Sequence, residues 1–187
     1  MKTRIHGWQA LILLAASWPL AALEASSSHV ALPGGDELWL RIPAAWSEKF
    51  DSPQKNMPPS VWLSQRQGPT FNVLITPLAG TAVGEAMSDD LKLHAIVTSI
   101  ARNTLSRAVE MAIPVHDLTG ADVHGYYIFA TDRAPAPGEW KYLWQGMINI
   151  DDAPFAFTIL TNDGQEAIAK AALELIRNAS RHSRTAT

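Results

Sequence analysis

The chain has 187 residues, of which 47% are hydrophobic and 18% are charged, and it contains no cysteine. The lack of cysteine excludes a disulfide framework, a thiolate nucleophile, a Cys-ligated zinc and a lipid-modified N-terminal cysteine. Fifteen Lys and Arg against eighteen Asp and Glu give a net charge of −3, so the composition offers no basic footprint for nucleic acid or for an anionic membrane surface.

The N-terminus has the three-part pattern of a secretory signal peptide. Lys2 and Arg4 form a basic start, an uncharged and mostly apolar run covers residues 10–20, and small residues follow. The apolar run is shorter than the roughly 20 residues that span a bilayer core. We therefore expect cleavage after Ala25, with Ala22 as the alternative, and a periplasmic or secreted protein without a stable membrane anchor.

Composition divides the chain into four parts. They are a signal peptide (1–25), a flexible N-terminal segment (26–36), a single domain (37–178) and a polar C-terminal tail (179–187). A domain of about 150 residues buries roughly 68 to 70% of its unfolded surface, so hydrophobic burial alone can hold it together without disulfides.

Apolar residues at every second position predict the first strands of the domain. This alternation covers residues 37–42. Residues 44–59 contain three prolines and predict a long loop, with Trp46 as an anchor on the core. Two runs typical of strands, 61–65 and 70–76, are separated by Gly and Pro and predict a hairpin.

The second half of the domain predicts two helices around a group of strands. Ser88 as N-cap and apolar residues at helical spacing predict a helix over 88–107, and Asp163 with Glu166 resembles a capping box before a closing helix. Short links predict that the strands between the helices form an antiparallel meander over 112–118, 123–131, 140–149 and 155–161. The predicted fold class is α+β, an antiparallel sheet of about six or seven strands covered by two main helices.

Six apolar residues from the first and last strands and the closing helix are expected to meet in one core. They are Leu40, Ile42, Phe157, Ile159, Ile168 and Leu175.

The opening strand and its flank resemble a known family. Leu40, Arg41, Ile42 and Pro43, followed by Trp46, are similar to the start of the PsbP-like superfamily, and the order of elements is similar through most of residues 37–178. Within that superfamily the chain looks like a bacterial DcrB-related domain of unknown function. It departs from those lipoproteins because it lacks a lipid-acceptor cysteine. The resemblance implies a PsbP-like fold and a non-enzymatic binding, accessory or chaperone-like role.

Asp117 and His124 are the candidate residues for catalysis. If residues 119–122 form the turn, the two side chains face each other across a hairpin, and the carboxylate can orient the imidazole. No serine can be assigned as a nucleophile, and an ion pair at a hairpin end is the commoner meaning of such a pair.

No metal or cofactor is expected. The histidines lack the spacing of a metal site, and no glycine-rich loop leads into a helix. One exception depends on processing, because trimming to Ser27 places His29 third from a free amine, a geometry that can hold Cu(II) or Ni(II).

Aromatic and proline residues are the candidates for binding. Trp140, Tyr142 and Trp144 are expected on one face of a strand, where such a stripe stacks on sugars or peptides or else belongs to the core. Pro135 and Pro137 mark a rigid loop, and Trp46 marks another. We expect an exported, non-enzymatic protein that acts on another protein in a chaperone-like, inhibitor-like or immunity-like way. The alternative is a small periplasmic hydrolase that uses Asp117 and His124.

Overall fold

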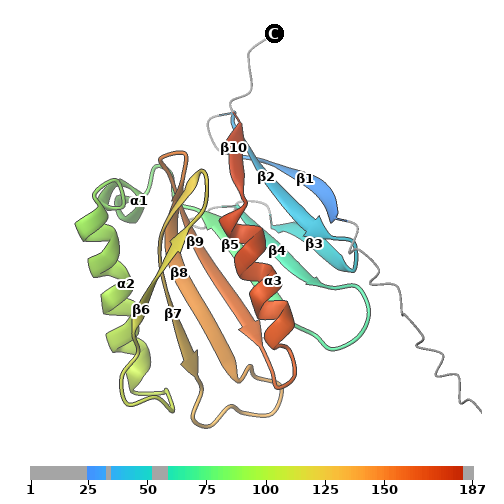
Figure 1. Cartoon of the computed structure of the whole chain (residues 1–187), viewed down its shortest axis with the longest axis vertical. Coiled ribbons are helices and arrows are strands. Elements are labelled where there is room, and N and C mark those ends of the chain that lie inside the picture. The colour runs from blue at the N-terminus through green and yellow to red at the C-terminus, as the bar shows by residue number, and fades with distance from the viewer. Residues whose placement is uncertain (1–24, 33–34, 52–58, 183–187) are drawn as a thin grey trace, which may run out of the picture.

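The computed structural model describes residues 25–32, 35–51 and 59–182. Two antiparallel sheets and two main helices build the domain, which confirms the predicted α+β class (Figure 1). Residues 1–24 of the predicted signal peptide and the last five residues of the predicted tail lie outside the described residues.

The larger sheet has seven strands, and every neighbouring pair in it is antiparallel. In spatial order the strands are β3 (Trp46–Asp51), β4 (Ser60–Gln65), β5 (Asn72–Pro77), β9 (Ala153–Thr161), β8 (Tyr142–Ile150), β7 (Val123–Thr131) and β6 (Val115–Thr119). The predicted hairpin is confirmed as β4–β5, and the predicted meander is confirmed as β6 to β9.

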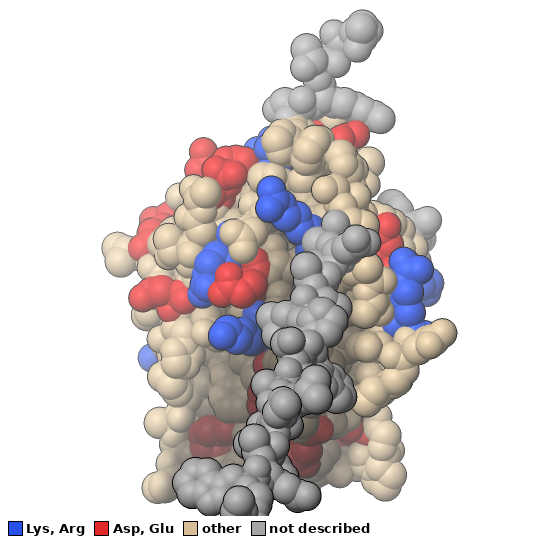
Figure 2. Space-filling model, turned by 45° about the vertical axis from the view of Figure 1, so that its right-hand side comes forward, with Lys and Arg blue, Asp and Glu red and all other residues tan. Residues whose placement is uncertain are grey.

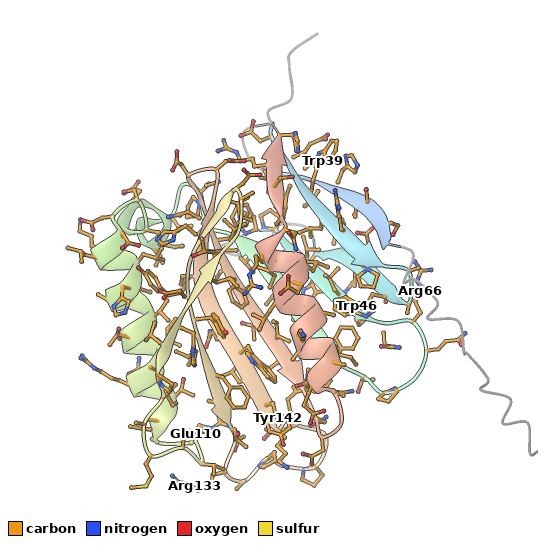
Figure 3. The ribbon with its side chains drawn as sticks, viewed as in Figure 1. Trp39, Trp46, Arg66, Glu110, Arg133 and Tyr142 are labelled. Atoms are coloured by element: carbon orange, nitrogen blue, oxygen red, sulfur yellow. The ribbon has the colours of Figure 1, made fainter. Side chains whose placement is uncertain are left out.

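Strand β3 replaces part of the loop that was predicted over residues 44–59. Its six residues pair along their whole length with β4. The three prolines of the predicted loop all follow Asp51, so none of them removes a backbone donor from this ladder. Trp46 at the start of β3 is only 4% exposed and packs on Phe71 at a ring distance of 4.6 Å. Its carbonyl accepts a hydrogen bond from Nε of Arg66, which lies beside it in Figure 3.

The smaller sheet joins both ends of the described chain. It consists of β1 (Ala25–Ala31), β2 (Glu37–Pro43) and β10 (Ser180–His182), with β2 in the middle. We predicted a flexible segment over residues 26–36 and a tail from 179 onward, and both contain a strand instead. The side chain of Val30 in β1 is buried in the main core, and Arg181 binds the carboxylate of Asp36. These contacts lie between residues far apart in sequence, so local composition does not reveal them.

His29, the histidine that could bind Cu(II) or Ni(II) after trimming to Ser27, lies on the exposed face of the smaller sheet. His29 lies in β1 with its ring 4.0 Å from Trp39, and His182 lies 4.2 Å from the same indole.

The two main helices cover opposite faces of the larger sheet. Helix α2 (Asp90–Leu105) packs on β6, β7 and β8, whereas α3 (Glu166–Arg177) packs on β9 and on β2 of the smaller sheet (Figure 1). A short helix, α1 (Ala82–Ala86), precedes α2 and was not predicted.

Both helix starts differ in detail from the prediction. The N-cap of α2 is Asp89, one residue after Ser88, and its carboxylate accepts hydrogen bonds from the first turn. The capping box before α3 does not form, because the carboxylate of Asp163 binds Lys141 and Tyr142 instead.

The core lies mainly on the α3 side of the larger sheet. The six residues expected there belong to one cluster; Ile168 is partly buried, and the other five are at most 5% exposed. This prediction is confirmed. A second, smaller cluster under α2 contains Val97, Ala101 and Ile128.

Candidate functional site

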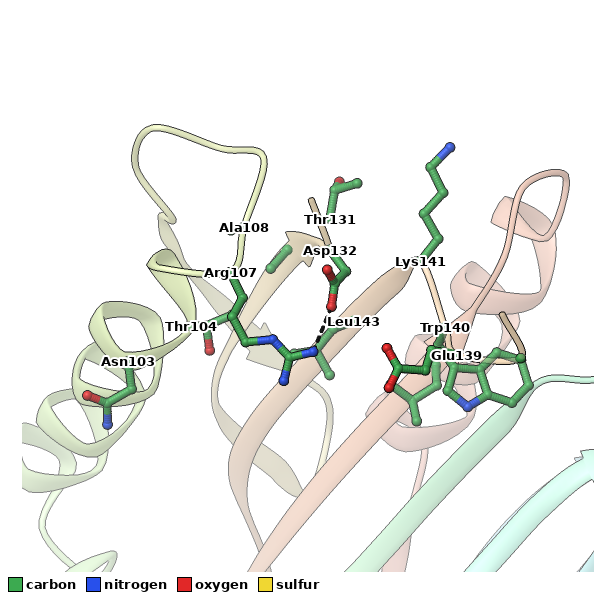
Figure 4. Close-up of a pocket in the computed structure, with 13 residues that line it drawn as sticks. Asn103, Thr104, Arg107, Ala108, Thr131, Asp132, Glu139, Trp140, Lys141 and Leu143 are labelled. Atoms are coloured by element: carbon green, nitrogen blue, oxygen red, sulfur yellow. Dashed lines mark hydrogen bonds and ion pairs between the residues drawn. The ribbon is translucent and has the colours of Figure 1, made fainter. Parts of the chain in front are cut away.

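A cleft of about 570 Å³ opens where the C-terminal end of α2 meets the sheet (Figure 4). This volume lies within the roughly 300 to 1,000 Å³ of small-ligand sites. Its lining consists of Asn103, Thr104, Arg107, Ala108, Ala130, Thr131, Asp132, Gly138, Glu139, Trp140, Lys141, Leu143 and Leu160. We refer to this set as the cleft.

Hydrogen bonds between the segment that follows α2 and the end of β7 form one wall of the cleft. The carbonyl of Arg107 accepts a bond of 2.9 Å from the backbone of Arg133, and Val109 donates to the carbonyl of Thr131 at 2.8 Å. The guanidinium of Arg107 adds an ion pair of 3.0 Å with Asp132, drawn as a dashed line in Figure 4. This wall is therefore preformed.

The connection between β7 and β8 forms the opposite wall. The carboxylate of Glu139 accepts a hydrogen bond of 3.0 Å from the backbone of Ala136, and the backbone of Glu139 donates to the carbonyl of Ala136. Gly138 between them has a φ of +87°, which favours glycine. The loop thus closes on itself and positions Trp140 at the cleft.

Lys141 points away from the other charged groups of the cleft in Figure 4. Its Nζ lies 2.7 Å and 2.9 Å from the two carboxylate oxygens of Asp163, and the hydroxyl of Tyr142 donates to the same group. These hydrogen bonds lower the pKa of Asp163, and the bond to Asp163 raises the pKa of Lys141. The Lys141 charge is therefore neutralised outside the cleft.

Beside the cleft, the 109–111 loop exposes two apolar side chains on a fixed backbone. Met111 is 98% exposed and Val109 is 57% exposed. Between them Glu110 turns inward, and both of its carboxylate oxygens accept the backbone N–H of Thr131, at 3.1 Å and 3.0 Å. Burial raises the pKa of Glu110, but the hydrogen bonds from Thr131 and from the backbone of Glu110 together outweigh burial, so the pKa is lowered overall. In Figure 3, Glu110, Arg133 and Tyr142 lie at the same end of the molecule.

The structure does not pair Asp117 with His124, which corrects that prediction. Thr119 lies opposite His124, and Asp117 lies opposite Tyr126. The turn is tighter than expected, because Gly120 donates to the carbonyl of Val123. Strand β6 therefore extends to Thr119, and the register of the hairpin shifts by two residues from the predicted one. The proposed hydrolase therefore lacks the carboxylate–imidazole pair on which that alternative depended.

His124 instead binds Asp90 at the start of α2. Its Nε2 lies 2.7 Å from Oδ1 of Asp90, and the hydroxyl of Tyr126 donates to both oxygens of the same carboxylate at 3.0 Å. The hydrogen bonds from His124 and then Tyr126 lower the pKa of Asp90, while burial and this bond raise the pKa of Tyr126. The cluster fastens α2 to β7.

The aromatic residues predicted for binding are divided between two sides of the sheet. Trp140 precedes β8 and lines the cleft. Tyr142 and Trp144 lie on the α3 side, where their rings are 6.1 Å and 4.7 Å from the ring of Phe129. Trp46 lies in the core and presents almost no surface.

Pro135 and Pro137 are exposed on the same connection that carries Trp140. Sequence reasoning thus found Trp140 but missed Arg107, Glu139 and Met111. Met111 lies between the predicted helix, which ends at residue 107, and the predicted strand, which begins at residue 112, so no pattern in the sequence assigned it a role.

The described part of the chain holds neither a group of three or more His, Asp or Glu suited to a metal ion nor a helix long and apolar enough to cross a bilayer. On the face seen in Figure 2, acidic and basic side chains are interspersed.

No protein-family model matches the sequence, and no curated protein matches it either. A solved structure that resembles the fold is that of LpqN, involved in cell envelope biogenesis of Mycobacterium tuberculosis. The TM-score is 0.49 at 12% sequence identity, and the similarity covers 84% of this chain and 91% of that chain. The resemblance of the opening strand to the PsbP-like superfamily stays a prediction. Function is therefore inferred from the residues of this chain.

Proposed function

We propose that this chain is an exported accessory protein that binds another protein at the cleft. The cleft carries the proposal, because it combines an apolar floor, an indole wall and polar rims in a preformed cavity. Ligand sites have this composition, with a few polar groups placed to orient what binds. Leu143 and Leu160 supply the floor, and Trp140 supplies the aromatic wall.

The 109–111 loop extends this surface beyond the cleft. A methionine that is 98% exposed gains nothing for folding, yet the inward carboxylate of Glu110 holds its backbone in place. Rigid display of apolar side chains favours contact with a partner, and methionine adapts well to different apolar surfaces. A protein partner large enough to reach both the cleft and Met111 fits these features.

The signal-peptide pattern supports export. We expect the intact mass of the exported protein to correspond to a chain that starts at Ser26. A soluble exported form that retains Met1 would contradict this part of the proposal.

Photocrosslinking in the native host tests the site. A photoreactive phenylalanine at Asn103 is expected to give one discrete adduct, because this exposed residue lines the cleft. The same group at Lys170, which is exposed on α3, serves as the control and is expected to give none. Adducts of equal yield from both positions would indicate collision rather than binding.

Affinity for the crosslinked partner, once purified, provides the second test. An indole that becomes buried against a partner is a common centre of binding energy. Trp140→Ala is therefore expected to weaken binding by about thirtyfold or more, equivalent to about 2 kcal/mol. The matched control is Trp39→Ala, which removes a partly exposed tryptophan from the smaller sheet. If both variants bind like the wild type while their thermal unfolding stays cooperative, the cleft is not the site.

A further inference from the structure

Four charged side chains line the cleft, and three of them are in ion pairs. Arg107 is neutralised by Asp132, and Lys141 is neutralised by Asp163 outside the cleft. Glu139 has no ion pair among the described residues, although its carboxylate faces the cavity in Figure 4. Glu139 is therefore the one lining group of the cleft whose charge is uncompensated. Beside the lining, Arg133, which donates to the carbonyl of Ala108, and Glu110, which accepts from Thr131, add one charge of each sign.

The surroundings of Glu139 suit a cation that has an apolar stem. The indole of Trp140 is the next side chain in the wall, and an aromatic face attracts a cation within about 6 Å of its centre. Leu143 and Leu160 form an apolar floor beside it. Lysine and arginine side chains bury their methylene stems along such surfaces while the charged end stays near water.

Resting on the proposed function, we infer that the partner inserts a basic side chain, Lys or Arg, into the cleft. Its cationic end pairs with Glu139 and lies against Trp140, and its stem covers Leu143 and Leu160. An acidic side chain is excluded by the same arrangement, because Arg107 is already paired and Glu139 repels a second carboxylate.

Small amides with matched stems test this inference without the partner. The probes are N-acetyl-lysine methylamide, its norleucine analogue, which has the same stem without the charge, and its glutamate analogue. Binding to the full mature chain is followed at millimolar concentration through the indole N–H resonance of Trp140, assigned with Trp140→Phe. We expect the lysine probe to bind about three- to tenfold more tightly than the norleucine probe, and the glutamate probe not to bind.

The variant Glu139→Gln removes the negative charge of the carboxylate and keeps the shape of the side chain, so it tests the contribution of that charge alone. Its amide oxygen can still accept the Ala136 N–H that holds the loop, so the fold of the connection is retained. Lysine and norleucine are then expected to bind equally well. The control Glu166→Gln removes an exposed carboxylate from α3 and should keep the preference for lysine.

Two results would overturn the inference. They are equal binding of lysine and norleucine to the wild type, and a lysine preference that survives in Glu139→Gln. Neither result affects the crosslink from Asn103, so failure of the basic-anchor inference is distinguishable from failure of the proposed function. Conversely, a lysine preference without a crosslink would show a cation site that no protein partner occupies.

Discussion

The two helices of this domain pack on the larger sheet in different ways, and the difference explains where the cleft lies. Helix α3 buries Ala169, Ala172, Leu175 and Ile176, and so it stays in contact with the sheet to its end. Helix α2 buries only Leu93, Val97 and Ala101. In the last turn of α2 the polar residues Asn103 and Thr104 line the cleft, and no residue of α2 after Ala101 is fully buried, so this end of the helix leaves a hollow over Leu143 and Leu160.

This comparison shows how an incomplete apolar stripe makes a site. A helix with a full stripe excludes water along its length and contributes stability. A helix whose stripe ends early exposes part of the sheet face, and the polar residues of its last turn become a wall. The α3 side is therefore expected to carry stability, and the α2 side to carry binding.

The largest expected effect is on the α3 side. Leu175 is 5% exposed within the main cluster, so Leu175→Ala should lower the free energy of unfolding by about 2 to 5 kcal/mol. Urea denaturation followed by circular dichroism measures this change. An unchanged midpoint would show that α3 contributes no more than α2.

Truncation at the matching position of α2 should cost less. Val97 is fully buried in the smaller cluster, and Val97→Ala removes two methyl groups, with an expected cost of about 1 to 2.5 kcal/mol. The same denaturation experiment measures it. A loss as large as that of Leu175→Ala would contradict the difference between the two helices.

Acid should weaken the attachment of α2 at its N-terminal end. The pKa of Asp90 is lowered below its ordinary value of 3.8 by hydrogen bonds from His124 and Tyr126, so the folded state favours the ionised carboxylate. The resulting stability is present above pH 3.8 and is lost as the pH falls through the lower folded-state pKa. Hydrogen exchange of the first turn of α2 in Asp90→Asn should therefore exceed that of the wild type near neutral pH, and the difference should shrink at low pH. A difference that is independent of pH would assign the attachment to other contacts.

The smallest effect on stability is expected at the 109–111 loop. Met111 is almost completely exposed, so Met111→Ser should change the free energy of unfolding by no more than about 0.5 kcal/mol. Binding to the crosslinked partner should nevertheless weaken, which separates the binding side of the molecule from its core. Unchanged affinity would remove this loop from the interface.

Much of the fold is predictable from sequence because its signals are local. The alternation from Leu38 to Ile42 and the apolar stripe of the closing helix are periodic over a few residues, and both identify the buried face correctly. Strands β3 and β10 could not be predicted in this way. They are held by backbone pairing with β4 and β2, which lie elsewhere in the chain, and their own residues have no clear alternation.

The candidate site is less predictable for the same reason. The sequence by itself determined that the chain lacks cysteine chemistry, that its domain is α+β and that Trp140 lies next to a strand rich in aromatic residues. Only the tertiary structure decided that Trp140 turns toward Arg107 and Glu139, and that His124 pairs with Asp90. Hairpin register and loop closure place these side chains, and both depend on hydrogen bonds such as Gly120 to Val123 that no local period encodes.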